Sequence, residues 1–194
     1  SVVYVSQEKA ILFSADGKLA SEDIVTLNNQ GVEIADYNAA FEFVKNIKAN
    51  SILIDPKRTC FAIYDSIPSA VNIVEKINPS TSLKAIKNEV EVDHIRQTMV
   101  NDGVAMTKFF KWLEEAIGQE ELSEISIAEK LRGFRAEQAG FVDVSFNTIA
   151  GYLDHGALPH YSANETSNYT LKAEGLLLVD SGGQYKTGTT DITR

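Results

Sequence analysis

The sequence predicts two domains: an α/β domain over residues 1–82 and the first part of an α+β domain over residues 83–194. In the first, short apolar runs of strand length alternate with segments of helical periodicity, which is typical of a mixed sheet covered by helices. In the second, a long amphipathic stretch precedes several short runs rich in Tyr, Thr and Gly, which favours helices followed by strands. The polar residues that follow Pro79 place the boundary near Ser82.

The composition indicates a globular chain with a real core. The sequence has 194 residues, 44% of them hydrophobic, which is enough for one large or two small domains. The formal net charge is −9 and the basic residues are scattered, so neither nucleic acid nor an anionic membrane surface is an expected partner. No apolar run approaches the length of a membrane span. The single cysteine, Cys60, excludes an internal disulfide and fits a cytoplasmic location, and we expect it to be a small buried hydrophobe.

Apolar runs define the elements of the first domain. Two strands at residues 2–5 and 10–13, joined by a polar turn, are expected to form a short hairpin. Helices are expected at residues 21–29 and 38–47, and further strands at residues 31–34, 51–54 and 71–74. The acidic residues of this domain stand apart at element ends, where carboxylates serve as caps and turn residues. The sequence therefore predicts no catalytic cluster here.

A long helix opens the second domain. Asn88, with Glu91 three residues later, forms a capping-box pattern, and Gly118 marks the far end of the helix. Apolar residues recur between them at helical spacing and predict the buried face: Ile95, Met99, Met106, Phe110, Leu113 and Ile117.

A second, shorter helix follows. Ser126 with Glu129 is a capping-box pattern that predicts a helix through residue 138, and Gly140 is the expected C-terminal stop. Strands are then expected over residues 141–146 and 148–150, followed by a polar loop over residues 151–168. Loops beside a site on rigid strands commonly carry substrate contacts.

The end of the chain carries two aspartates on expected strands. Residues 176–179 form an apolar run that ends at Asp180, as in a buried strand that delivers a carboxylate at its end. Turn residues follow at 181–183, and residues 184–193 are rich in Tyr and Thr, so they predict a second strand that pairs back on the first and carries Asp191.

Two carboxylates on paired strands suggest a metal site. Like charges held close in a dry site are unfavourable unless protons or metal ions neutralise them, and hard divalent cations prefer oxygen ligands. Asp180 and Asp191 are therefore candidate ligands of a dinuclear centre bridged by carboxylates. For such a pair taken alone, the alternative is that Asp180 begins a turn and Asp191 is a solvated strand residue.

The whole string around these aspartates favours the metal site. DSGGQYKTGTTDITR closely resembles the DSGxQYxxGTTDxTR signature of Xaa-Pro aminopeptidases, also called aminopeptidase P, of the pita-bread metallopeptidase family. The helical stretches after residue 82 resemble the opening of that catalytic domain, and VVYVSQEKAILF resembles a strand pair of the creatinase/prolidase-like domain that precedes it. The resemblance implies these two folds and a chain truncated at both ends.

The resemblance also implies roles for individual residues. In the family the two aspartates of the string are metal ligands, which gives those roles to Asp180 and Asp191. HGALPHY is similar to the family's NGAxxHY element, whose histidine lines the substrate cleft and helps to orient or polarise the scissile peptide. That role falls on His160. His155 stands where the family often has another polar residue, and we expect it to be an exposed loop histidine.

The activity implied is removal of an N-terminal residue that is followed by proline, by a hydroxide that bridges two divalent metal ions, with Mn²⁺ the family's usual metal. Peptides with proline at the second position are the expected partners, and a homodimer is a further expected association. The absence of a G-x-S-x-G motif agrees with a mechanism that needs no serine nucleophile.

Three further expectations follow from the resemblance. The remaining ligands, one histidine and two glutamates, belong to downstream segments that this sequence does not contain, so we expect the 194-residue chain itself to be inactive. A prolidase that acts on Xaa-Pro dipeptides is an alternative within the family. A non-catalytic pita-bread binding module is an alternative from another functional class.

Overall fold

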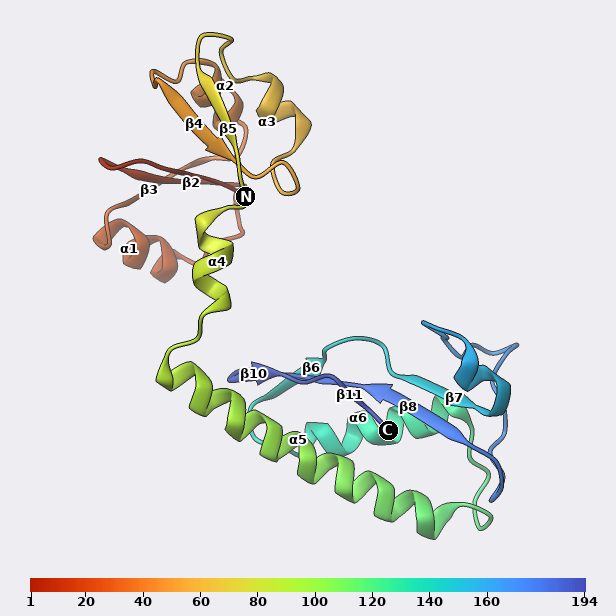
Figure 1. Cartoon of the computed structure of the whole chain (residues 1–194). Helices are drawn as coiled ribbons and strands as arrows, with labels where there is room; N and C mark the ends of the chain where they lie inside the picture. Colours follow the sequence, from red (N-terminus) through yellow and green to blue (C-terminus); the bar gives the residue numbers. More distant parts are fainter. The chain divides into compact units, whose positions relative to one another are not determined.

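The chain consists of two compact units. The computed structural model describes all 194 residues, and its backbone contacts divide them into Ser1–Ile86 and Lys87–Arg194 (Figure 1). Each unit has its own cluster of buried hydrophobic residues. Ser82 lies inside helix α4 (Pro79–Ala85), and the division between the units falls just after that helix.

The first unit contains two small sheets and four helices. β1 (Val2–Val5) pairs antiparallel with β2 (Ala10–Ser14), which runs parallel to β3 (Val32–Asp36). A separate parallel pair is formed by β4 (Ser51–Ile54) and β5 (Asn72–Glu75). The helices are α1 (Ser21–Asn29), α2 (Ala39–Lys45), α3 (Phe61–Asp65) and α4. The mixed strand directions and the alternation with helices confirm the predicted α/β class.

Two features of the first unit differ from the expectation. Helices α3 and α4 occupy stretches in which the sequence pattern indicated no helix. A local cap starts α4, because Pro79 stands in its first turn and the Asn78 side chain accepts a hydrogen bond from the Ser80 N–H at 3.1 Å. The expectation that Cys60 is buried is wrong: it is exposed, because it is the residue that caps the start of α3.

The second unit places two helices against two antiparallel sheets. The helices are α5 (Glu89–Ala116) and α6 (Glu124–Ala136), which pack on each other (Figure 1). One sheet has the order β10 (Gly188–Thr189), β9 (Gly183–Tyr185), β6 (Phe141–Val144). The other has the order β11 (Ile192–Thr193), β8 (Leu177–Ser181), β7 (Ile149–Tyr152), and a 3₁₀ helix, η1 (Leu153–Ala157), follows β7. This is the expected α+β arrangement.

Helix α5 begins as predicted but buries a partly different face. Asn88 and Glu91 form the capping box, with both hydrogen bonds at 2.9 Å. Met99 was expected in the core, yet it is 43% exposed, whereas Thr98 and Asp102 are buried. The reason is that this part of α5 packs against polar groups of the last strands rather than against apolar side chains.

No helix, α5 included, combines the length and apolar character needed to cross a membrane.

Helix α6 begins earlier than expected. Its capping box joins Ser123 and Ser126, so Ser126 occupies the third helical position and is not the cap, and Glu129 is exposed. The helix ends at Ala136, and Gly140, with φ 78°, belongs to the turn before β6 rather than to the helix stop. The predicted boundaries were shifted because Ser123 provides a competing cap of the same chemical type.

A buried polar group joins the helices of the second unit to its strands. Arg135 of α6 forms an ion pair with Asp102 of α5, and both side chains are fully buried. The hydroxyl group of Tyr185 in β9 donates a hydrogen bond to the same carboxylate at 2.9 Å. Burial and the neighbouring Asp102 raise the pKa of Tyr185 far above its usual range, so the phenol stays neutral and acts as a donor.

Candidate functional site

Asp180 and Asp191 lie close to two neighbouring strands at the end of the chain. Asp180 is in β8, where its pairing partner in β11 is Thr193, and Asp191 immediately precedes β11. The Asp180 Oδ1 atom accepts a hydrogen bond from the Thr193 hydroxyl group at 2.9 Å. Asp180 is half-buried and Asp191 is exposed. The single strand expected over residues 184–193 is instead divided into β9, β10 and β11.

Residues 183–189 form a hairpin of β9 and β10, and the chain then passes tightly by Gly182 before it enters β11. The Thr190 Oγ1 atom accepts a hydrogen bond from the Gly183 N–H at 2.8 Å, and the Ser145 hydroxyl group donates to the Thr190 carbonyl at 2.9 Å. A Cβ atom at Gly182 would meet the Thr190 carbonyl oxygen and the Ser145 Oγ atom. Only glycine therefore fits between the two strands that carry the aspartates.

The donor set fits a divalent cation only in part. Carboxylate oxygens are the ligands that hard cations prefer, and both aspartates can be reached from solvent. No group of three or more His, Cys, Asp or Glu side chains is arranged to hold a metal ion. Asp180 and Asp191 can thus supply part of a metal site, and further ligands are needed to complete it.

His160 is held in an unusual backbone conformation. Its side chain is exposed, and its φ is 58°, in the left-handed region that residues other than glycine seldom adopt. Such a conformation is unfavourable by about 1–3 kcal/mol and persists only where the surrounding structure enforces it. Hydrogen bonds from Leu158 N–H to the His155 carbonyl and from Tyr161 N–H to the Leu158 carbonyl, both 3.2 Å, form the turn that contains His160.

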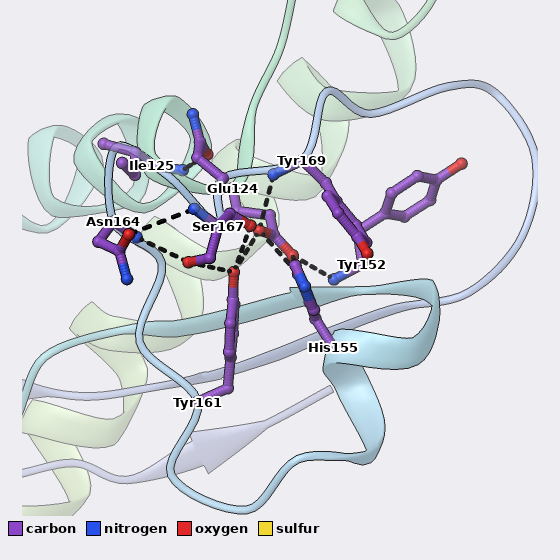
Figure 2. A network of polar contacts seen from close by, with 9 residues as sticks. Glu124, Ile125, Tyr152, His155, Tyr161, Asn164, Ser167 and Tyr169 are labelled. Carbon is purple, nitrogen blue, oxygen red and sulfur yellow. Dashed lines mark hydrogen bonds and ion pairs between the residues drawn. The ribbon is translucent and has the colours of Figure 1, made fainter.

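His155 lies in the interior, so the expectation of an exposed loop histidine is wrong. It belongs to η1 and is 8% exposed. Its ring stacks between those of Tyr161 and Tyr169, with centroids 4.3 and 3.7 Å away. Its Nδ1 atom lies 2.9 Å from Oε1 and 3.1 Å from Oε2 of Glu124 (Figure 2). A proton on Nδ1 makes the imidazole a donor to this carboxylate.

Glu124, the first residue of α6, is the centre of a network that Figure 2 shows from close by. Its carboxylate is fully buried and accepts the Tyr152 N–H at 2.8 Å and the Tyr169 N–H at 3.0 Å. The Tyr161 hydroxyl group donates to Oε2 at 2.8 Å and lies 2.9 Å from the Ser167 carbonyl, so these two acceptors share its one proton. With His155, four groups from residues 152–169 converge on one carboxylate.

The network keeps Glu124 ionised. Burial by itself raises the pKa of this carboxyl group, but the hydrogen bonds from Tyr152, Tyr169, Tyr161 and His155 act together in the opposite direction and lower it below its ordinary value. Burial and the adjacent Glu124 raise the pKa of Tyr161, so its hydroxyl group stays protonated. A charged acceptor surrounded by several hydrogen-bond donors is a stable buried arrangement.

Sequence reasoning did not identify Glu124. An acidic residue in the first turn of a helix is common because it interacts with the helix dipole, and this gives no sign of burial. Its partners lie about thirty to forty-five positions later in the sequence, for example 31 for His155 and 45 for Tyr169. The one signal available in the sequence was the presence of two histidines, His155 and His160, in a loop rich in tyrosine.

Comparison with known families decides the class of the protein. The model of metallopeptidase family M24 matches residues 93–194, more than half of the chain, and that of the creatinase/prolidase N-terminal domain matches residues 1–91. The chain belongs to metallopeptidase family M24. The resemblance to aminopeptidase P that the closing string indicated is thereby confirmed, as is the predicted fold class.

Curated relatives with similar sequences are described as Xaa-Pro aminopeptidases or aminopeptidase P. Xaa-Pro aminopeptidase 1 of Dictyostelium discoideum is 42% identical over 100% of this chain and 31% of its own length. Aminopeptidase P2 of Arabidopsis thaliana is 31% identical over 98% of this chain and 31% of its own length. The chain spans about a third of the length of the curated relatives it matches.

Solved structures of similar proteins agree with the fold. An X-prolyl aminopeptidase from Caenorhabditis elegans, described as a cytosolic enzyme with a di-nuclear active site, matches with a TM-score of 0.91 and 28% identity, over 99% of this chain and 33% of that one. A Xaa-Pro dipeptidase from Bacillus anthracis matches with a TM-score of 0.75 and 20% identity, over 99% of this chain and 53% of that one. At that identity the second likeness concerns the fold alone.

Proposed function

We propose that the M24 enzyme containing these residues removes an N-terminal residue that precedes proline from peptides. The observation that supports the proposal is the string of residues 180–194, in which Asp180 lies on β8 and Asp191 just before the paired strand β11. Similar relatives of the chain are described as Xaa-Pro aminopeptidases. The cytosolic description of the nematode enzyme supports a cytoplasmic location.

In this proposal the residues have distinct roles. Asp180 and Asp191 hold two divalent cations, with Mn²⁺ the expected metal, together with ligands from outside this sequence. When bound, the ions supply an acidified water molecule and polarise the scissile carbonyl. The Thr193 hydroxyl group holds Oδ1 of Asp180, and thereby orients the other carboxylate oxygen. His160, exposed on its loop, lines the substrate cleft and helps to orient the peptide.

Hydrolysis assays with the full-length enzyme and Mn²⁺ test the proposal. Xaa-Pro-Xaa tripeptides should be cleaved at the Xaa-Pro bond. Asp180→Asn and Asp191→Asn should each lower kcat/KM by more than the roughly 10- to 100-fold that loss of a residue supporting a metal ligand causes. Asp93→Asn is the matched control, because Asp93 is an exposed helix residue paired only with Arg96.

The same assays separate the alternatives. Activity confined to Xaa-Pro dipeptides would identify a prolidase. Binding of Xaa-Pro peptides without hydrolysis at any Mn²⁺ concentration would identify a non-catalytic binding module. Wild-type activity in both aspartate variants would show that Asp180 and Asp191 are not the metal ligands.

A further inference from the structure

We propose that Glu124 is a positioning residue that fixes the loop on which His160 is presented. The proposal rests on the function proposed above for the role of His160 in peptide turnover. It goes beyond that function by assigning a task to a buried residue of α6 that contacts neither aspartate. Three structural observations carry it.

The first observation is that one carboxylate holds the loop at several points. Glu124 accepts hydrogen bonds from Tyr152 at the end of β7, from the His155 ring in η1, from the Tyr161 hydroxyl group and from the Tyr169 N–H. The loop over residues 153–168 has no strand pairing of its own. Its path is therefore determined to a large extent by these four contacts with the start of α6.

The second observation is that the contacts flank His160 closely. Tyr161 is the next residue along the chain, and His155 lies five positions before His160, at the start of the preceding turn. The His155 ring stacks on the Tyr161 ring, so the two anchors also hold each other (Figure 2). The left-handed backbone of His160 lies between two side chains that are tied to one buried group.

The third observation is that only an ionised carboxylate suits this position. A carboxylate has two oxygen atoms that only accept hydrogen bonds, whereas a glutamine amide brings two donors of its own. At position 124 the amide nitrogen would replace one of the two oxygens, so it would face either the Tyr152 N–H, which binds Oε1, or the Tyr169 N–H, which binds Oε2, and that buried donor would lose its partner. Glu124→Gln keeps the size of the side chain and disturbs the network selectively.

Nuclear magnetic resonance of the 194-residue chain tests the positioning without any need for activity. The sequence has three histidines, so each ring can be assigned by substituting them in turn. In Glu124→Gln we expect the His160 ring signals to move toward their position in the unfolded chain. The signals of His94, exposed on α5, should stay in place, and unchanged Trp112 fluorescence should show that the unit remains folded, because Trp112 packs on Phe109 and Phe134. Glu129→Gln, a charge change at an exposed site of the same helix, should move none of them.

Tyr161→Phe is a milder variant, useful where Glu124→Gln prevents folding. It removes one donor and retains the ring stack, so a smaller shift of the His160 signals in the same direction is expected. Tyr152→Phe is its matched control. That hydroxyl group donates at 2.7 Å to the Glu174 carbonyl and leaves the Glu124 network untouched. Unchanged His160 signals in folded Glu124→Gln or Tyr161→Phe chains would overturn the proposal.

A double-mutant cycle in the full-length enzyme tests whether Glu124 acts through His160. We expect Glu124→Gln alone to lower kcat/KM on a Xaa-Pro-Xaa tripeptide by up to about 10²-fold, which is the loss that a misplaced catalytic group can cause. In a His160→Ala background it should have little further effect. Independent, multiplying effects of the two substitutions would contradict the proposal.

The two kinds of experiment fail separately. If the enzyme cleaves no Xaa-Pro peptide, or if His160→Ala has full activity, the proposed function or the role of His160 in it is wrong. The resonance measurements then decide alone whether Glu124 positions the loop. If turnover depends on His160 but the His160 resonances do not change in Glu124→Gln, only the positioning proposal is wrong.

Discussion

Arg135 and Asp102 form a two-point ion pair that has no access to solvent. The Arg135 Nε atom donates to Oδ1 at 2.7 Å and Nη2 donates to Oδ2 at 3.1 Å, between helices α6 and α5.

The only tryptophan of the sequence, Trp112, lies in the same unit and packs against Phe109 and Phe134. Its fluorescence during a urea titration therefore reports the unfolding of this unit.

Asp102→Asn should strongly destabilise the second unit. The substitution leaves the Arg135 guanidinium buried without its counter-charge, which is unfavourable by about 3–5 kcal/mol. We expect the free energy of unfolding, measured by Trp112 fluorescence, to fall by an amount of that size. Asp93→Asn breaks the exposed ion pair with Arg96 and should change it by less than about 1 kcal/mol. Similar effects of the two substitutions would contradict this account of the buried pair.

Gly182→Ala should be far more damaging than another glycine substitution in the same unit. The added methyl group would meet the Thr190 carbonyl and the Ser145 hydroxyl group, and would push β8 and β11 apart. Gly103, in the middle of α5, has open space around it, so Gly103→Ala should stabilise the chain by roughly 0.5–1 kcal/mol. Urea titrations of both variants measure the difference, and a tolerated Gly182→Ala would show that the strands can separate without loss.

The stability of the second unit should fall at acidic pH through Glu124. The folded-state pKa of this group is lowered, so its contribution is fully present above the pKa of an unfolded glutamate, about 4.3, and is lost as the pH falls through the folded-state pKa. Urea midpoints measured from neutral to acidic pH should therefore decline less steeply in Glu124→Gln. Asp143 is an exposed carboxylate whose pKa is lowered by a hydrogen bond from the Val144 N–H and by Arg132. Asp143→Asn should therefore alter the pH profile of stability less than Glu124→Gln does. Parallel profiles for wild type and Glu124→Gln would refute the prediction.

The 194-residue polypeptide should bind Mn²⁺ only weakly. Asp180 and Asp191 provide two carboxylates, no third ligand-type side chain joins them, and Asp191 is exposed. Hard divalent cations need about six oxygen ligands, and water would have to supply most of them. Calorimetric titration should give heats no larger than those of the Asp180→Asn/Asp191→Asn double variant. Tight binding of two ions per chain would contradict the expectation.

Local signals were sufficient for most of the elements. The Asn88 and Glu91 capping box lies within four consecutive residues, and it was identified correctly because both of its hydrogen bonds are local. The strands at Val2–Val5 and Ser51–Ile54 and the helix at Ser21–Asn29 have the predicted bounds. The start of α6 was placed too late because Ser123 and Ser126 are chemically equivalent caps in the sequence.

Long-range packing explains what the sequence did not reveal. His155 looks like an exposed loop histidine until Glu124, Tyr161 and Tyr169 surround it, and none of these contacts leaves a periodic pattern. Met99 fits an apolar stripe, but the face of α5 that is buried at this point carries Asp102. Burial of that carboxylate is possible because Arg135 and Tyr185 donate hydrogen bonds to it. The aspartates of the closing string were found by their motif, whereas the division of the expected strand was not, because it depends on the β9–β10 hairpin and on the contacts of Thr190 with Gly183 and Ser145.

The hydrogen bond from Tyr185 to Asp102 spans 83 positions of sequence, which bears on how the chain folds during synthesis. The sheets of the first unit are complete once Glu75 has been made, so this unit can close early on the ribosome. The second unit lacks its central strand β8 until Ser181 has been made, and the Asp102 carboxylate lacks its phenol partner until Tyr185 follows. Helices α5 and α6 are therefore made well before the strand residue that seals the polar interface around Asp102.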